Sequence, residues 1–372
     1  MKTLFRFVLI LSLPLPAMAQ VPKLPEAINK ILSPLQSNDE PGAAVLVLRD
    51  QQVVFEHGYG VSDLRTLHSI DGHTNFRLAS MTKQFTAMAI MLLVHDGKLH
   101  YEDHLTDLFP DFPAYGKAIT VRHLLNHTSG LQDYEDLMPS HAQNQPPAKL
   151  VQIHDEGVLD LLKRERTTKF IPGTKWAYSN SGYVVLGLIV NKVSSEPFGQ
   201  FLRDRIFVPL QMTDTLAYEK GKNEVYSRAY GHTKTTASWQ ETDQSSTSAT
   251  LGDGGVYSSL GDLAKWDRAL RNHQLLSPAE MQPALTPVKV ADGKPREPDG
   301  KSAEYGFGWF LNPYKGHARM WHYGETIGFR TAIERFPDDK LTIIVLSNRA
   351  DVKAREVALQ IADLCLGLET QK

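Results

Sequence analysis

Strand-forming segments stand near both ends of this 372-residue chain, and they constrain its fold more than any other feature. Near the start, residues 43–48 are continuously apolar, and a polar turn leads to a second strand pattern at 53–56. Near the end, residues 329–336 and 341–346 form another hairpin pattern, followed by a helical pattern at 354–366. Strands from the two ends can share one antiparallel sheet, which predicts a mixed α/β fold with the middle of the chain inserted as a second domain.

The segment between the two hairpins has mainly helical patterns, at residues 121–126, 158–163, 183–190, 198–207 and 260–270. The third of these is apolar all round, which indicates a buried helix, and we expect Asn180 and Ser181 to cap it. Residues 132–147 and 234–250 are polar and are predicted to be exposed loops. Residues 305–310 are interpreted as a strand whose glycines let another backbone approach closely.

Bulk properties fit a globular protein of this kind. The apolar fraction of 42% and the charged fraction of 22% are ordinary, and the length permits a sizeable core. We divide the chain into a mainly helical domain at residues 79–299 and an α/β domain built from residues 20–78 and 300–372. The net charge of −2, without a polybasic run, argues against nucleic acid and anionic membranes as partners. Cys365, the only cysteine, lies in an apolar helical pattern, so we expect a packed thiol.

The first 19 residues have the pattern of a secretory signal peptide. Lys2 and Arg6 precede an apolar run at residues 7–16, and an Ala-x-Ala sequence precedes Gln20. A membrane anchor is the weaker reading, because the apolar run is short and contains two prolines. We therefore expect an exported protein, periplasmic or secreted, without a stable membrane anchor.

Ser80 and Lys83 are the first candidate catalytic residues. They are three positions apart at the start of a predicted helix, so their side chains can meet on one face. A serine hydroxyl needs a nearby base to become a good nucleophile, and a lysine can serve if burial lowers its pKa. Ser80 is the only serine followed by lysine at this spacing. The spacing alone also fits a surface serine and lysine that meet by chance.

Tyr178 and Asn180 form the second candidate motif, Tyr-x-Asn, directly after a Pro-Gly turn. A phenolate or a neutral lysine can each accept the serine proton. Asn180 can orient the lysine and donate a hydrogen bond to a substrate carbonyl. Taken alone, the two residues are equally consistent with a packed aromatic ring and a helix cap.

His322 and Gly324 form the third motif, His-x-Gly, on a predicted strand. A glycine at an exposed strand edge lets an extended substrate pair with the backbone. His322 is predicted to assist proton transfer or to bind a carboxylate, with a structural histidine as the alternative. The motif is weak by itself, since His95-Asp96-Gly97 also matches it at a helix end. The chain lacks G-x-S-x-G, H-E-x-x-H and phosphate-loop motifs, and its histidines show no metal spacing, so no cofactor or metal is predicted.

In this order, the three motifs resemble those of the penicillin-recognising serine hydrolases, which include class C β-lactamases, D-alanyl-D-alanine carboxypeptidases, D-aminopeptidases and related esterases. Further matching segments lie at residues 124–131, 254–258 and 262–266. The resemblance implies a β-lactamase/transpeptidase-like fold, with an antiparallel sheet flanked by helices, an inserted all-helical domain and the site in the cleft between them.

The resemblance also implies the roles of the site residues. Ser80 would be the acylated nucleophile, while Lys83 and Tyr178 would activate it and carry its proton. Asn180 would position the substrate and the lysine. The backbone N–H groups of Ser80 and Glu325 would form the oxyanion hole.

The third motif departs from the β-lactamases of this group, which carry Lys-Thr-Gly where this chain has His322-Tyr323-Gly324. A histidine is a weaker partner for a β-lactam carboxylate than a charged lysine. We therefore rank a hydrolase of D-amino-acid-containing peptides first, either a D-aminopeptidase or a D,D-carboxypeptidase. A carboxylesterase, a β-lactamase and a non-enzymatic penicillin-binding sensor follow. The expected partner is a small molecule or peptide, with cell-wall fragments as candidates, and the oligomeric state is left open.

Overall fold

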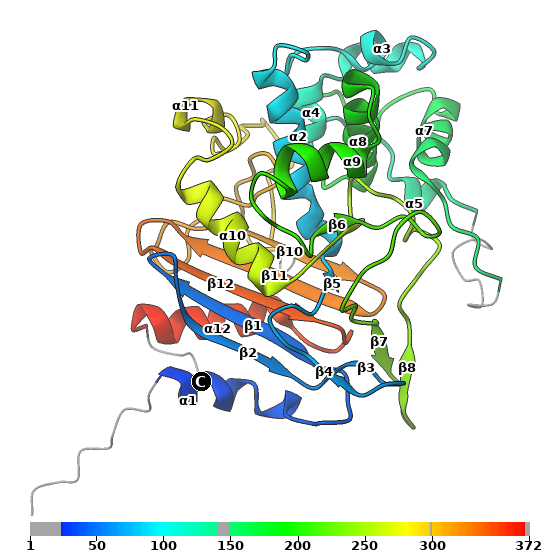
Figure 1. Cartoon of the computed structure of the whole chain (residues 1–372). Coiled ribbons are helices and arrows are strands. Elements are labelled where there is room, and N and C mark those ends of the chain that lie inside the picture. Colours follow the sequence, from blue (N-terminus) through cyan, green and yellow to red (C-terminus); the bar gives the residue numbers. More distant parts are fainter. Residues whose placement is uncertain (1–23, 140–148, 298–299, 369–372) are drawn as a thin grey trace, which may run out of the picture.

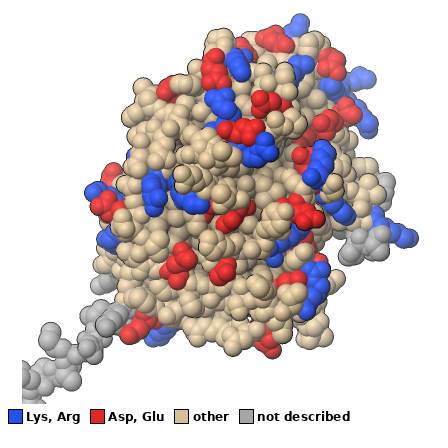
Figure 2. Space-filling model, viewed as in Figure 1, with Lys and Arg blue, Asp and Glu red and all other residues tan. Residues whose placement is uncertain are grey.

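The computed structural model describes residues 24–139, 149–297 and 300–368. The predicted signal peptide therefore lies outside the described residues, as does the second half, residues 140–147, of the predicted loop at 132–147. Within the described ranges, no helix combines the length and the apolar composition that a membrane span requires. Acidic and basic side chains are interspersed over the face shown in Figure 2, in keeping with the small net charge.

Both ends of the chain contribute to one antiparallel sheet, as predicted (Figure 1). In the described part of the chain it has five strands, in the order β10 (Met320–Thr326), β11 (Phe329–Phe336), β12 (Leu341–Ser347), β1 (Ala43–Arg49) and β2 (Gln52–Tyr59). The two ends meet where β1 pairs with β12, with Ala43 opposite Ser347. Strand β10 is at the edge, with one side of its backbone free of the sheet.

Strand β1 is apolar from Ala43 to Leu48 because helices cover both faces of the sheet. Ala43, Val45 and Val47 face a core shared with α1 (Leu24–Ile31) and α12 (Ala354–Leu366). The alternate residues Ala44, Leu46 and Leu48 face the larger core, which extends into the helical part. Helix α10 (Leu260–Arg271) packs on this second face against β1 and β12.

The helical part is built around α2 (Lys83–His95) and α8 (Asn180–Ser194), which pack against each other. Both are buried along most of their length, because they carry apolar residues on every side. Around them lie α3 (Leu105–Leu108), α4 (Val121–Leu125), α5 (Tyr134–Leu137), α7 (Asp155–Arg164), α9 (Phe198–Leu202) and α11 (Pro278–Met281). The 3-10 turns are η1 (Ser33–Leu35), η2 (Ala79–Thr82) and η3 (Ala114–Ala118), and a π turn forms η5 (Arg203–Phe207).

Short strands connect the two parts. They are β3 (Val61–Asp63), β4 (His68–Ser69), β5 (Phe76–Arg77), β6 (Leu216–Ala217), β7 (His232–Lys234), β8 (Trp239–Glu241) and β9 (Val256–Ser258). Strand β9 pairs with both β5 and β6, so the segment before Ser80 is tied to chain some 180 residues away. The predicted domain limits at 78/79 and 299/300 remain predictions.

Two loop and strand predictions are wrong. Residues 305–310 form a turn, with single bridges from Tyr305 to Phe310 and from Phe310 to Trp321. Gly308 has φ +75°, which a strand does not accommodate, and a Cβ there would lie 2.8 Å from the carbonyl oxygen of Lys83. Gly308 does permit a close backbone approach, as predicted, and the backbone that approaches it is that of helix α2. Residues 234–250 are only partly exposed, since they include β8 and the buried Asp243 and Thr250.

The cap of α8 is also one residue earlier than predicted. Ser179 is the N-cap, and its Oγ accepts a hydrogen bond of 3.0 Å from the N–H of Gly182. Asn180 is the first residue of the helix, which leaves its side chain available for the site.

Candidate active site

Ser80 lies in the turn η2, immediately before α2. Ala79, the residue before it, has φ +49°, a left-handed conformation that costs energy for a residue with a Cβ. Neighbouring strands hold the turn in place, since Thr331 Oγ1 donates to the carbonyl of Leu78 at 2.9 Å and Val256 N donates to Thr82 Oγ1 at 3.1 Å. The serine side chain is therefore presented on a fixed, strained turn.

Lys83 is completely buried directly beside the serine hydroxyl. Its Nζ lies 3.0 Å from Ser80 Oγ, 2.9 Å from Asn180 Oδ1 and 2.9 Å from the carbonyl oxygen of Asp253. Burial lowers the pKa of Lys83 to about 8, and the negative charge of Asp253 opposes this shift. At pH 7 only about a tenth of the amine is neutral and able to accept a proton, and this fraction rises to about half at pH 8.

Tyr178 completes the group around Ser80. Lys83 Nζ lies 4.9 Å from the centre of the Tyr178 ring. Burial raises the pKa of Tyr178, and a side-chain hydrogen bond with Ser80 only partly opposes the shift. The phenol is therefore protonated at neutral pH, which makes it suited to passing a proton on and makes Lys83 the stronger candidate for the base.

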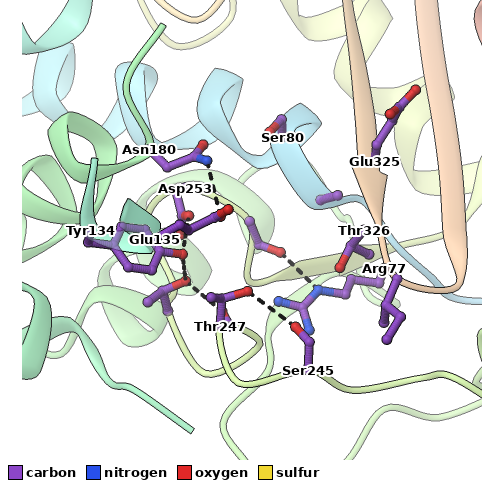
Figure 3. Close-up of a pocket in the computed structure, with 14 residues that line it drawn as sticks. Arg77, Ser80, Tyr134, Glu135, Asn180, Ser245, Thr247, Asp253, Glu325 and Thr326 are labelled. Carbon is purple, nitrogen blue, oxygen red and sulfur yellow. Dashed lines mark hydrogen bonds between the residues drawn. The ribbon is translucent and has the colours of Figure 1, made fainter. Parts of the chain in front are cut away.

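A cavity of about 250 Å³ opens in front of Ser80 (Figure 3). Three of the predicted site residues, Ser80, Asn180 and Glu325, line it together. Glu325 comes from the edge strand β10, so its backbone and that of η2 face the same space. The other lining residues are Arg77, Ala79, Tyr134, Glu135, Ser245, Thr247, Thr250, Asp253, Gly254, Thr326 and Ile327.

His322 is completely buried and is not among the residues that line the cavity. Its Nδ1 lies 2.7 Å from the carbonyl oxygen of Tyr323, so Nδ1 carries the proton, and Nε2 lies 3.3 Å from the Tyr305 hydroxyl. Burial, and secondarily the charge of Lys83, lower the pKa of His322 to about 3. A neutral imidazole cannot supply the positive charge of the lysine that β-lactamases carry here, so any role of His322 with substrate is that of a neutral group.

Several cavity residues were absent from the set predicted from motifs. Asp253 accepts from the hydroxyl of Tyr134 at 3.2 Å through Oδ2, and Asn180 Nδ2 donates to Glu135 Oε1 at 3.4 Å. Asp253 stands next to a segment matching the family, which was a usable signal, whereas Glu135 lies on the short helix α5, inside the segment predicted to be an exposed loop. Burial raises the pKa of Glu135, and the nearby carboxylates add to the shift. Within the described residues, no cluster of three or more His, Cys, Asp or Glu could hold a metal ion.

The fold and this site together define the class of β-lactamase-fold serine hydrolases. A family model described as Beta-lactamase matches residues 28–366, and the chain therefore belongs to that family. It is 32% identical over 346 residues to penicillin-binding protein 4* of Bacillus subtilis, covering 89% of this chain and 73% of the relative. It is 27% identical over 349 residues to a D-aminopeptidase of Brucella anthropi, covering 91% of this chain and 61% of that longer protein.

A solved structure with the same fold is that of D-amino acid amidase from Ochrobactrum anthropi SV3. It superposes with a TM-score of 0.78 at 23% identity, covering 92% of this chain and 98% of the amidase. The likeness supports the β-lactamase/transpeptidase-like architecture predicted from the sequence.

Proposed function

We propose that this protein is an exported serine hydrolase that forms an acyl-enzyme on Ser80 and acts on D-amino-acid-containing peptides or amides. The observation that carries the proposal is the 3.0 Å contact between Lys83 Nζ and Ser80 Oγ, with the amine fully buried. Burial is what allows a lysine to act as a base near neutral pH. The hydrolases of D-amino-acid substrates among its relatives support the substrate class.

In the proposed reaction, Ser80 Oγ attacks the substrate carbonyl carbon, and its proton passes to neutral Lys83. The tetrahedral intermediate then loses its amine, which takes a proton from Tyr178, while Tyr178 is reprotonated by Lys83. Water next attacks the acyl carbon, gives its proton to the same pair, and Ser80 Oγ leaves and regains a proton. The carbonyl oxygen is held by the N–H groups of Ser80 and Glu325, and each such donor is worth about 10²- to 10³-fold in rate.

The charges in the cavity favour a substrate with a free amino group. Glu135 and Asp253 line one side of it, and Glu135 lies next to the predicted substrate-positioning residue Asn180. A cationic α-amine bound there would lie close to Ser80, whereas a carboxylate would be repelled. We therefore place a D-aminopeptidase or D-amino-acid amidase first.

One observation favours the D,D-carboxypeptidase alternative. Arg77 is the one Lys or Arg side chain among the described residues that line the cavity. It donates to the carbonyls of Gly254 and Ser248, but its Nη1 is buried without a hydrogen-bond partner. A terminal carboxylate that reached Nη1 would satisfy it.

Acylation and turnover together test the proposal. Labelled penicillin or an activated p-nitrophenyl ester should modify the wild type but not Ser80→Ala, and equal labelling of both would remove the nucleophile assignment. D-amino-acid p-nitroanilides with a free amine should be turned over faster than N-acetylated D-alanyl-D-alanine peptides, simple esters or β-lactams. Faster turnover of the N-acetylated D-alanyl-D-alanine peptides would favour a D,D-carboxypeptidase, of simple esters a carboxylesterase, and of β-lactams a β-lactamase. Acylation without turnover of any substrate would favour the penicillin-binding sensor.

The substitution Glu135→Gln tests whether the substrate binds through a free amino group. The variant should raise KM for the free-amine anilide about five- to tenfold, the scale of one accessible charged contact. Its effect on ester acylation should be smaller, because glutamine keeps an oxygen that can accept the hydrogen bond from Asn180 Nδ2. Asp136→Asn is the matched control, because Asp136 lies on the same short helix and pairs with Lys169 at 3.6 Å. Export is tested by sequencing the N-terminus of the mature protein from the host envelope or medium, which should begin at Gln20.

A further inference from the structure

His127 is fixed to the chain on both sides of Tyr178. The N–H of Ala177 donates to the carbonyl of His127 at 3.0 Å, and the N–H of Ser179 donates to His127 Nδ1 at 3.1 Å. The residues immediately before and after Tyr178 are thus held by one histidine. That histidine follows the short helix α4, some fifty residues earlier in the chain.

The ring of His127 also packs against the ring of Tyr178. The two ring centres are 4.4 Å apart with an angle of 37° between the planes. On its other sides the completely buried imidazole packs against Tyr305 at 4.7 Å and Tyr183 at 5.1 Å. Such contacts leave the phenol of Tyr178 little freedom to tilt.

The hydrogen bond to Ser179 fixes the protonation state of the imidazole. A backbone N–H can only donate, so Nδ1 must accept and the ring proton is on Nε2. Burial, followed by the charge of Lys83, keeps the pKa of His127 well below its ordinary value. His127 is absent from the residues lining the cavity, so it is placed to act through Tyr178 rather than on substrate.

We infer that His127 is a positioning residue that holds Tyr178 in register with Ser80 and Lys83, through the hydrogen bond from Ser179 to its Nδ1. The inference rests on the proposed role of Tyr178 in proton transfer. The segment at 124–131, which the proposed mechanism otherwise leaves unused, gains a function in this way.

Two substitutions distinguish the contribution of the Nδ1 acceptor of His127 from that of its aromatic ring. His127→Phe keeps a ring but removes the acceptor, whereas His127→Asn loses the ring but keeps an acceptor near the Nδ1 position. Asparagine also tolerates the φ of +62° that His127 adopts. With an activated p-nitrophenyl ester, His127→Phe should lower the acylation kcat about 100-fold with little change in KM, and His127→Asn should retain it to within about tenfold. Thermal unfolding of both variants verifies that folded protein is compared.

A double-mutant cycle decides whether His127 acts through Tyr178. In the Tyr178→Phe background, His127→Phe should cause almost no further loss, because the group it positions is already missing. Additive losses, a wild-type kcat in His127→Phe, or losses in both His127 variants that merely follow thermal stability would overturn the inference. Full activity of Tyr178→Phe alone would instead reject the proposed role of Tyr178, and labelling of Ser80→Ala would reject the nucleophile.

Discussion

A Cβ on Gly324 would lie 2.1 Å from the carbonyl oxygen of Leu78. The glycine of the His-x-Gly motif thus lets the edge strand β10 pack against the turn that carries Ser80. Since the clash would be with backbone, it cannot be relieved by a side-chain rotation.

Gly324→Ala should therefore push β10 and η2 apart, lower the free energy of unfolding by about 2–3 kcal/mol and reduce acylation of Ser80. Urea unfolding and ester-burst measurements check both effects. Gly261→Ala, on helix α10, is the control, because a Cβ there would lie 3.6 Å from its nearest neighbour, the carbonyl oxygen of Gly72. This control should leave stability unchanged or raise it by less than about 1 kcal/mol. Equal stability of the two variants would contradict the packing role.

The rate of acylation should rise with pH as Lys83 loses its proton. Its pKa is about 8, so kcat/KM is expected to increase through pH 7 and 8 and to level off above pH 9. Lys83→Arg keeps the charge but cannot become neutral, and should lose about 10²- to 10⁴-fold in acylation. A wild-type rate that does not change between pH 7 and pH 9 would exclude Lys83 as the base.

His322 should make the folded state less stable in acid. The folded protein keeps this imidazole neutral down to about pH 3, whereas the unfolded chain takes up a proton near pH 6.5. Stability that is complete above pH 6.5 is thus lost as the pH falls toward 3. The difference in unfolding free energy between pH 7 and pH 4.5 should be smaller in His322→Gln than in the wild type. His68→Gln, on the exposed strand β4, should retain the full difference.

Alanine substitutions at two N-cap serines distinguish an effect on activity from an effect on stability alone. Ser179 caps α8 and Ser259 caps α10, with Oγ accepting from Gly182 N at 3.0 Å and from Asp262 N at 3.3 Å. Replacing either serine by alanine should cost about 1 kcal/mol of stability. Because α8 begins with Asn180, Ser179→Ala alone should also lower kcat, by about tenfold. Similar kcat values in the two variants would show that the start of α8 tolerates displacement.

Individual strands and helices could be predicted from the sequence, because their hydrophobic patterns depend on residues only a few positions apart. The continuous apolar run at 43–48 and the hairpin at 329–346 defined the sheet, and apolar residues on all sides defined the buried helix α8. The prediction failed at 305–310, because a left-handed glycine pressed against α2 overrides the local preference for a strand. It also failed at 234–250, where polar residues are buried against the site.

The sequence by itself determined which residues could react: Ser80 and Lys83 are three positions apart, and that spacing brings them together on any helix. Only the tertiary structure decided that Asn180 and the Asp253 carbonyl, 97 and 170 residues beyond Lys83, would accept its hydrogen bonds. It also decided the charge of each group, because burial makes Lys83 a base and keeps His322 neutral. The energy of a charge depends on the water that the fold removes from around it, and residue order does not specify that water.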